Sequence, residues 1–169
     1  VRVNTDIFLD VEADLTEGCG PLFVSTSNNS NGVQDHRWFY RVKGTNDFNE
    51  EVTTPFANYD LRNTTRDSLT YELIYVATNR FGCQESDTIE VLVWPELVAD
   101  FTATPERQIL PNKTINITNN TNPGPWEYNW QFGDGNTSTD VEIGDYEFET
   151  YGNYQILLEV SYGPCSNSH

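Results

Sequence analysis

Four oxygen-bearing side chains recur at every second position in the later half of the chain. They are Asp134, Asn136, Ser138 and Asp140. Carboxylate, amide and hydroxyl oxygens are the ligands that Ca²⁺ prefers in proteins, so this spacing predicts a calcium site. Polar residues at period two are equally typical of the solvent-facing side of a strand. Both interpretations stay open, and the sequence suggests no cofactor other than calcium.

Residues for covalent or acid–base catalysis are sparse. The chain has two histidines, His36 and His169, and no Ser/His/Asp, Cys/His or zinc-type pattern can be assembled around them. Paired carboxylates are plentiful, but in a chain with 26 Asp and Glu residues such pairs do not indicate glycoside hydrolysis. We therefore expect a protein that is not an enzyme and has no catalytic residues.

Tryptophan side chains could bind a sugar by stacking on its ring. Trp126 follows Pro123–Gly124–Pro125 and is interpreted as lying outside the alternating pattern of the next strand. We expect it to be exposed and assign it as a candidate glycan-stacking residue. Trp38 and Trp130 alternate with polar neighbours and are expected in hydrophobic cores.

The composition excludes two classes of protein. With 9 Lys and Arg against 26 Asp and Glu, the 169-residue chain has a formal charge of −17, and such a surface would repel the phosphates of nucleic acids. No apolar run approaches the length of a membrane span, so we expect no membrane insertion. The 9 Phe, 9 Tyr and 4 Trp residues can fill a core, which argues against disorder.

The cysteines give information on the cellular compartment of the protein. Cys19 and Cys83 lie near the start and the end of one repeat unit, and we expect them to form a disulfide, which leaves Cys165 over. Three free thiols in a cytosolic chain are the alternative. The richness in Asn, Thr and aromatic residues and the strand-only pattern favour an exported protein, located outside the cell or on its surface.

Alternation of period two is the dominant pattern, and it predicts strands. Two of the clearest runs are Tyr71, Leu73, Tyr75 and Ala77, and Tyr154, Ile156, Leu158 and Val160. Turn-forming residues separate the runs, and the pattern begins again after Trp94–Pro95–Glu96. The sequence predicts an all-β chain with two tandem antiparallel β-sandwiches, over residues 1–95 and 96–169.

The second unit carries two separated motifs. Trp130–Gln131–Phe132–Gly133–Asp134–Gly135 comes first, and Tyr146-x-Phe148 and Gly152-x-Tyr154 follow. In order and spacing they closely resemble the PKD (polycystic kidney disease) domain over roughly residues 97–163, with Tyr146 where the family often has His. The resemblance implies an Ig-like β-sandwich in which Trp130 and Phe132 face inward. Gly133 and Gly135 would form the turn, because glycine tolerates positive φ.

The first unit resembles the family more loosely. It has Trp38 in the expected strand, but it lacks the Gly-Asp-Gly turn. Two of its segments, Gly18–Cys19–Gly20–Pro21 and Gly82–Cys83, are similar to segments of the PKD-like repeats in long surface proteins of gliding bacteria with type IX secretion. That resemblance implies a Cys19–Cys83 disulfide and an adhesin-like or stalk-like role.

The repeat pattern also makes predictions about the ends. Residues 1–5 resemble the tail of the last strand of a preceding repeat. After Gly163–Pro164–Cys165 the second unit is expected to stop one strand short, which would expose a sheet edge.

Together these features predict a non-catalytic extracellular spacer and protein-interaction segment of a long, adhesin-like surface or secreted protein. Its partners would be neighbouring repeats of the same polypeptide and an extracellular protein or glycan. The alternative is an accessory glycan-binding module of a secreted polysaccharide-degrading enzyme, which the resemblance also allows.

Overall fold

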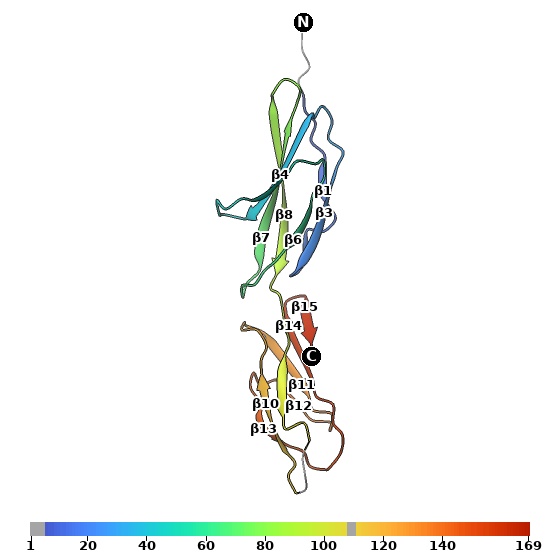
Figure 1. The fold of residues 1–169 in the computed structure, drawn as a ribbon, viewed down its shortest axis with the longest axis vertical. Coiled ribbons are helices and arrows are strands. Elements are labelled where there is room, and N and C mark those ends of the chain that lie inside the picture. Colours follow the sequence, from blue (N-terminus) through green and yellow to red (C-terminus); the bar gives the residue numbers. More distant parts are fainter. Residues whose placement is uncertain (1–5, 108–110) are drawn as a thin grey trace. The chain divides into compact units, whose positions relative to one another are not determined.

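A computed structural model describes residues 6–107 and 111–169 and consists of strands and connecting loops (Figure 1). The chain divides into two compact units, Val1–Glu96 and Leu97–His169. Each unit contains two sheets. The predicted fold class, all-β with Ig-like sandwiches, is confirmed. The described residues include no helix with the length and hydropathy of a membrane span.

In the first unit, a sheet of three strands has the order β1-β3-β6 and a sheet of five has the order β2-β8-β7-β4-β5. Their bounds are β1 Val11–Ala13, β2 Glu17–Cys19, β3 Leu22–Asn28, β4 Asp35–Val42, β5 Asn49–Val52, β6 Asn58–Leu61, β7 Leu69–Thr78 and β8 Gln84–Trp94. Inward side chains from both sheets form one core, in which Trp38, Leu61 and Leu73 are fully buried.

One pair in this unit departs from the antiparallel prediction. β2 runs parallel to β8, with Glu17 opposite Leu92 and Cys19 opposite Trp94. The chain first pairs antiparallel with β3 through β1 and then crosses to the other sheet without reversing direction. Because the crossing preserves the direction of the chain, the second pairing is parallel.

In the second unit, the sheets have the orders β13-β10-β9 and β12-β11-β14-β15. Their bounds are β9 Phe101–Thr104, β10 Thr114–Asn119, β11 Glu127–Gln131, β12 Thr137–Ser138, β13 Gly144–Glu147, β14 Leu157–Tyr162 and β15 Cys165–Ser168. Trp130, Leu158 and Val160 are fully buried. The Phe101 and Trp130 rings, 5.3 Å apart, join the two sheets.

The last strand was expected to be missing, and that expectation is wrong. β15 pairs antiparallel with β14, with Tyr162 opposite Cys165 and Glu159 opposite Ser168. The turn at Gly163, where φ is +57°, reverses the chain after only two residues. The strand is short, and the sequence offered no aliphatic alternation by which to recognise it. The predicted tail at residues 1–5 lies outside the described residues.

Both core tryptophans are held in the same way. Trp38 Nε1 donates a hydrogen bond to the Pro55 carbonyl, and Trp130 Nε1 donates one to the Asp140 carbonyl. A buried indole N–H needs such an acceptor, and in each unit a neighbouring loop supplies it. The prediction that these two residues lie in cores is confirmed.

Candidate functional site

The Gly-Asp-Gly turn after β11 is held by the side chain in its middle. One carboxylate oxygen of Asp134 accepts the backbone N–H of Asn136 at 2.9 Å, and the other accepts the Tyr146 hydroxyl at 2.7 Å. Gly133 and Gly135 have positive φ values of +80° and +98°. A Cβ on Gly133 would lie 2.6 Å from the Gln155 carbonyl oxygen, so the turn admits only glycine there.

These contacts shift two pKa values. Partial desolvation pushes the pKa of Asp134 up, but the hydrogen bonds from Tyr146 and Asn136 outweigh it and leave that pKa below its ordinary value. Desolvation, and then the hydrogen bond to Asp134, raise the pKa of the Tyr146 phenol. The arrangement therefore keeps Asp134 ionised and Tyr146 protonated, with the phenol donating.

The candidate calcium ligands do not form one cluster of carboxylates. Asp134 is engaged with Asn136 and Tyr146, while the Ser138 hydroxyl donates to Asp140 at 2.8 Å. No group of three or more His, Cys, Asp or Glu side chains in the described residues could hold a metal ion. Two of the four predicted ligands are carboxylates, and the other two are an amide and a hydroxyl. The absence of a cluster of three therefore does not test this site, and calcium binding stays a prediction.

An aromatic stack continues from this turn through the unit. Phe132 and Tyr146 stack at 4.0 Å, Tyr146 meets Phe148 edge-on at 5.0 Å, and Phe148 stacks on Tyr154 at 4.1 Å. The Tyr154 hydroxyl donates to the Thr150 carbonyl at 2.9 Å. A Cβ on Gly152 would lie 3.3 Å from the Tyr154 ring. The motif residues Phe132, Gly152 and Tyr154 therefore contribute to the side-chain packing of the second unit.

Trp126 is not exposed, so the expectation of an open stacking surface is wrong. Its exposed fraction is 7%, its Nε1 donates to the Asn122 carbonyl, and its ring meets Tyr162 edge-on at 5.3 Å. Trp126 is in phase with the aromatic residues at 128, 130 and 132, which are all buried. This alternation of period two, over four aromatic residues, is the signal that could have placed Trp126 inward.

The predicted Cys19–Cys83 disulfide is also wrong. Cys83 is a free, exposed thiol, whereas Cys19 and Cys165 are both disulfide-bonded. Cys83 follows the β7–β8 turn, where its N–H donates to the Asn79 side chain. Proximity to the ends of a repeat in sequence does not fix which thiols meet, because disulfide formation needs close approach of the two Cα atoms.

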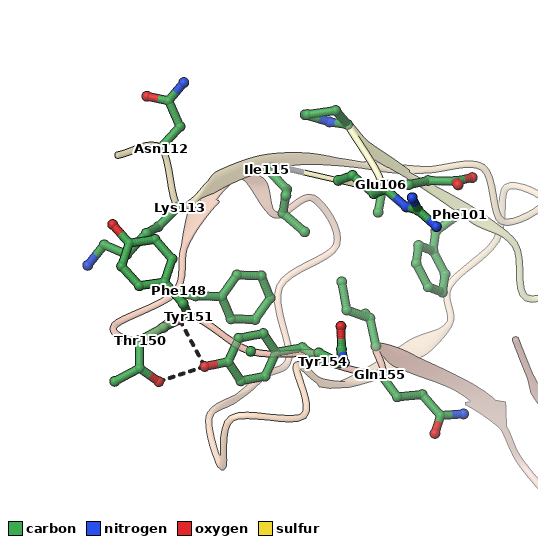
Figure 2. Close-up of a pocket in the computed structure, with 16 residues that line it drawn as sticks. Phe101, Glu106, Asn112, Lys113, Ile115, Phe148, Thr150, Tyr151, Tyr154 and Gln155 are labelled. Carbon is green, nitrogen blue, oxygen red and sulfur yellow. Dashed lines mark hydrogen bonds between the residues drawn. The ribbon is translucent and has the colours of Figure 1, made fainter. Parts of the chain in front are cut away.

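A pocket of about 770 Å³ lies in the second unit (Figure 2). Phe148, Tyr151 and Tyr154 gather on one side of it, and Phe101 lies on the other. Lys113 at its rim donates to the Glu149 carbonyl at 2.9 Å and lies 3.7 Å from Glu147. Of its lining residues, Phe148, Gly152 and Tyr154 were singled out from the sequence as motif residues, and none was predicted to bind a ligand.

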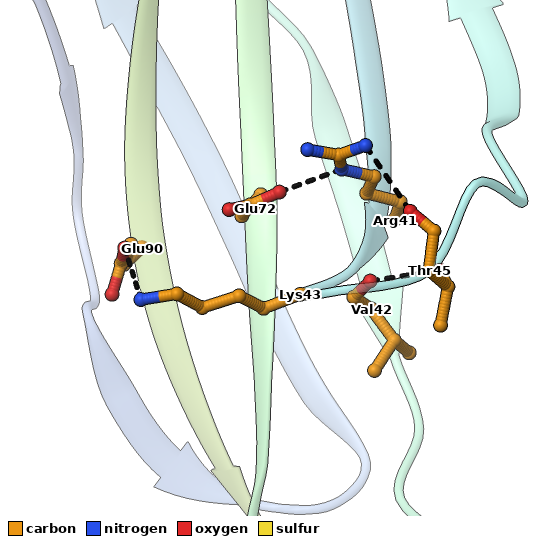
Figure 3. Close-up of polar contacts among 6 residues, drawn as sticks. All are labelled: Arg41, Val42, Lys43, Thr45, Glu72 and Glu90. Carbon is orange, nitrogen blue, oxygen red and sulfur yellow. Dashed lines mark hydrogen bonds and ion pairs between the residues drawn. The ribbon is translucent and has the colours of Figure 1, made fainter.

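The outer face of the five-stranded sheet carries cross-strand ion pairs (Figure 3). Arg41 on β4 bonds Glu72 on β7 at 2.6 Å, and Lys43 just after β4 bonds Glu90 on β8 at 2.6 Å. The hydrogen bond to Glu90 raises the pKa of Lys43. The Arg41 guanidinium also lies 4.9 Å from the Phe48 ring centre. These contacts tie strands of one sheet together.

The two imidazoles take part in structural contacts. His36 Nδ1 is 2.6 Å from the hydroxyl of Tyr75, and His169 Nε2 is 3.8 Å from an Asp100 carboxylate oxygen. They belong to different units, and each has a local contact of its own.

Comparison with known proteins supports the assignment of the second unit. Residues 98–168 match the family model of the PKD domain. No curated protein matches the chain.

Among solved structures, the chain is similar to the amphioxus IgVJ-C2 molecule, at 10% identity over 90% of this chain and 96% of that one, with a TM-score of 0.41. It is similar to murine CEACAM1b, at 12% identity over 96% of each chain, with a TM-score of 0.39. It is also similar to the fibronectin(III)-like modules of Clostridium thermocellum CbhA, at 16% identity over 94% of this chain and 91% of that one, with a TM-score of 0.36.

Proposed function

We propose that this chain is a non-catalytic extracellular segment, a spacer and protein-interaction module within a longer surface or secreted protein. The match of residues 98–168 to the PKD domain carries the proposal, because PKD domains are typically extracellular modules without catalytic activity. The oxidised state of Cys19 and Cys165 supports it, since structural disulfides persist mainly outside the reducing cytosol.

A spacer must resist unfolding under load, and the first unit has suitable features. β7 and β8 pair antiparallel from Leu69–Val93 to Thr78–Gln84, and the Arg41–Glu72 and Lys43–Glu90 contacts reinforce the same sheet. The acidic surface, with a formal charge of −17 for the chain, would keep neighbouring arrays apart.

The finer context is part of the proposal. That the parent is an adhesin-like protein of a gliding bacterium with type IX secretion rests on the resemblance of Gly18–Cys19–Gly20–Pro21 and Gly82–Cys83, although the Cys19–Cys83 disulfide that this resemblance implies is not formed. Neighbouring repeats and an extracellular protein would be its partners. The glycan-binding alternative, which the PKD resemblance also allows, loses Trp126 as its stacking residue, because that side chain is buried. A separate proposal is that calcium binds at Asp134, Asn136, Ser138 and Asp140, which thermal melts with and without calcium after chelation would test.

Single-molecule force spectroscopy tests the load-bearing role. The whole chain, with Cys83→Ser to prevent artificial cross-links, would be pulled from its two ends. We expect discrete unfolding events once the disulfide has been reduced, because an intact disulfide limits the length of chain that force can extend. Extension without any discrete event would contradict a load-bearing role, because a mechanical spacer needs cooperative resistance.

A further inference from the structure

The outer face of the five-stranded sheet carries apolar side chains at its centre. Alternate side chains of β4 and β7 point into the core, so Phe39, Ile74 and Val76 lie on the outer face, where they are partly exposed. Phe39 on β4 is opposite Ile74 on β7. The Phe48 side chain is 55% exposed, and its ring meets the Phe39 ring edge-on, with the ring centres 6.2 Å apart. We call these four residues the outer patch.

The outer face of the other sheet in this unit has a different composition. Its outward positions on β1, β3 and β6 are Glu12, Phe23, Ser25, Ser27, Asn58 and Asp60. Five of these six residues are polar, which is typical of a sheet face that meets water. The outer patch instead joins apolar side chains of two strands and a loop. Exposed apolar side chains that lie together are typical of a surface that binds another protein.

Charged side chains of both signs surround the outer patch. Three cations come from β4 and the residue after it, and three anions come from β5, β7 and β8. They pair as Arg37–Glu51, Arg41–Glu72 and Lys43–Glu90, of which Figure 3 shows the last two. The chain has 9 Lys and Arg against 26 Asp and Glu, so the remainder has 6 against 23. Asp35 and Glu17 lie further along the same face, opposite Thr78 and Leu92. The outer patch and the charges around it therefore form a neutral region of a strongly acidic chain.

This distribution of charge selects the partner that the outer patch fits. Two copies of so acidic a chain repel one another where their other surfaces meet, whereas the neutral patch permits close approach. We propose that the outer patch is a self-association surface, on which a second copy of this chain docks with its own outer patch. A two-fold axis along β7 places Ile74 against its counterpart and β4 over β8. Arg41 of one copy then faces Glu90 of the other, because Arg41 is opposite Glu72 and Glu72 is opposite Glu90.

The size of this face sets the strength of the association. Neighbouring strands lie about 4.8 Å apart and each residue spans about 3.4 Å, so four strands over about eight residues present roughly 500 Å². Two such faces bury about 1,000 Å² in total, which is the range of weak and transient contacts. We therefore expect a dissociation constant on the order of 100 µM. The inference goes beyond the proposed function, because it assigns the interaction surface and the partner.

Sedimentation equilibrium of the whole chain measures this association. Cys83→Ser would be present throughout, because the exposed thiol of Cys83 could otherwise cross-link two chains. Concentrations from about 10 µM to about 1 mM bracket the expected dissociation constant. A salt concentration of about 0.15 M shortens the range of the net repulsion to about 8 Å. The apparent mass should rise with concentration from that of one chain toward that of two.

Three variants of the chain locate the contact. Ile74→Glu should weaken association by about tenfold or more, because each dimer would then bury two unpaired carboxylates. Phe23→Glu is the matched control, since it adds the same charge at an exposed phenylalanine on the outer face of the other sheet, and it should leave association unchanged. Phe48→Glu should also weaken association and decides the matter if Ile74→Glu does not fold, because the Phe48 side chain is exposed and lies outside the core.

Three results would overturn the proposal. The first is the mass of a single chain at every concentration. The second is association that Ile74→Glu and Phe48→Glu leave unchanged, since the contact would then lie elsewhere on the chain. The third is an equal loss of association in Phe23→Glu, since net charge would then explain the effect. The mass of a single chain would leave the force measurement unaffected, so the two proposals fail separately.

Discussion

In the described residues of the two units, burial decreases at different points along the alternating runs. In the first unit, β7 and β8 pair from Leu69–Val93 to Thr78–Gln84. The inward side chains of β7 are buried from Tyr71 to Ala77, whereas on β8 only Val91 and Val93 are buried and Ile89 is partly exposed. In the second unit, β14 and β15 pair from Tyr162–Cys165 to Glu159–Ser168. Burial there extends to Leu158 and then decreases at Ile156 and Tyr154.

The difference separates the direction of a side chain from its burial. The runs from Tyr71 and from Tyr154 alternate equally well in the sequence, and both point their apolar residues inward. Period two sets that direction, because successive side chains leave opposite faces of a strand. Burial also needs a neighbouring segment: Leu158 and Val160, which lie beside the backbone of residues 165–169, are fully buried.

Alanine substitutions along β14 should give the largest effect. Leu158→Ala removes a fully buried side chain and should lower the free energy of unfolding of the second unit by about 2–5 kcal/mol. Ile156→Ala should cost less than half as much, since its side chain is partly exposed. Urea denaturation followed by tryptophan fluorescence would measure both, with Leu73→Ala as the equivalent in the first unit. Equal losses at 156 and 158 would contradict the difference in burial between these two side chains.

Two Asn-x-Thr turns offer a second comparison. The Asn63 amide donates to the carbonyls of Asp67 and Val93, its Oδ1 accepts from Thr65, and the residue is fully buried. Asn119 makes the same turn with Thr121 but is partly exposed. Asn63→Ala should cost about 2–3 kcal/mol and Asn119→Ala about 1 kcal/mol or less.

Chemical denaturation of the two alanine variants measures these costs. Ser at either position serves as a control, because a hydroxyl can still accept the turn hydrogen bond. A larger loss at Asn119 than at Asn63 would contradict the assignment of Asn63 as the more buried of the two turns.

Acidification should weaken the second unit before the first. The pKa of Asp134 is lowered on folding, so its stabilising contribution is present above its unfolded pKa and is lost as the pH falls through its folded pKa. We expect the Tm of the second unit to fall below about pH 4, and Asp134→Asn to flatten that decline. Differential scanning calorimetry between pH 2 and 6 would measure the Tm of the wild type and of Asp134→Asn. If the Tm of the variant falls with pH as steeply as that of the wild type, Asp134 is not the cause of the decline.

The cysteines that follow the two equivalent turns should differ in reactivity, with little effect on stability. Cys83 after the β7–β8 turn is free and exposed, whereas Cys165 after the β14–β15 turn is disulfide-bonded. Alkylation of the native, unreduced chain should therefore modify Cys83 alone, as peptide mapping by mass spectrometry would show. Cys83→Ser should abolish labelling and leave the Tm unchanged. Labelling at Cys165 would contradict the disulfide assignment.

Much of the fold follows from local patterns. The alternating runs at 71–77 and 154–160 gave the inward side chains correctly, and the cores around Trp38 and Trp130 follow from the same rule. The Gly133–Asp134–Gly135 motif predicted its turn, since positive φ at both glycines is a local requirement. The site was less predictable. The pocket is lined by residues 101–107, 112–115 and 148–156, and no single stretch of sequence records how these segments come together.

The amino-acid sequence by itself determined the class of the fold, the inward positions of its strands and the acidic surface, because these depend on residue type and on neighbours one or two positions away. The tertiary structure alone decided that Trp126 is covered by Tyr162, that Cys83 is the thiol left free, and that Ile156 lines a pocket with Phe101 and Phe148. Each of these depends on distances between segments far apart in the chain, which local periodicity does not encode.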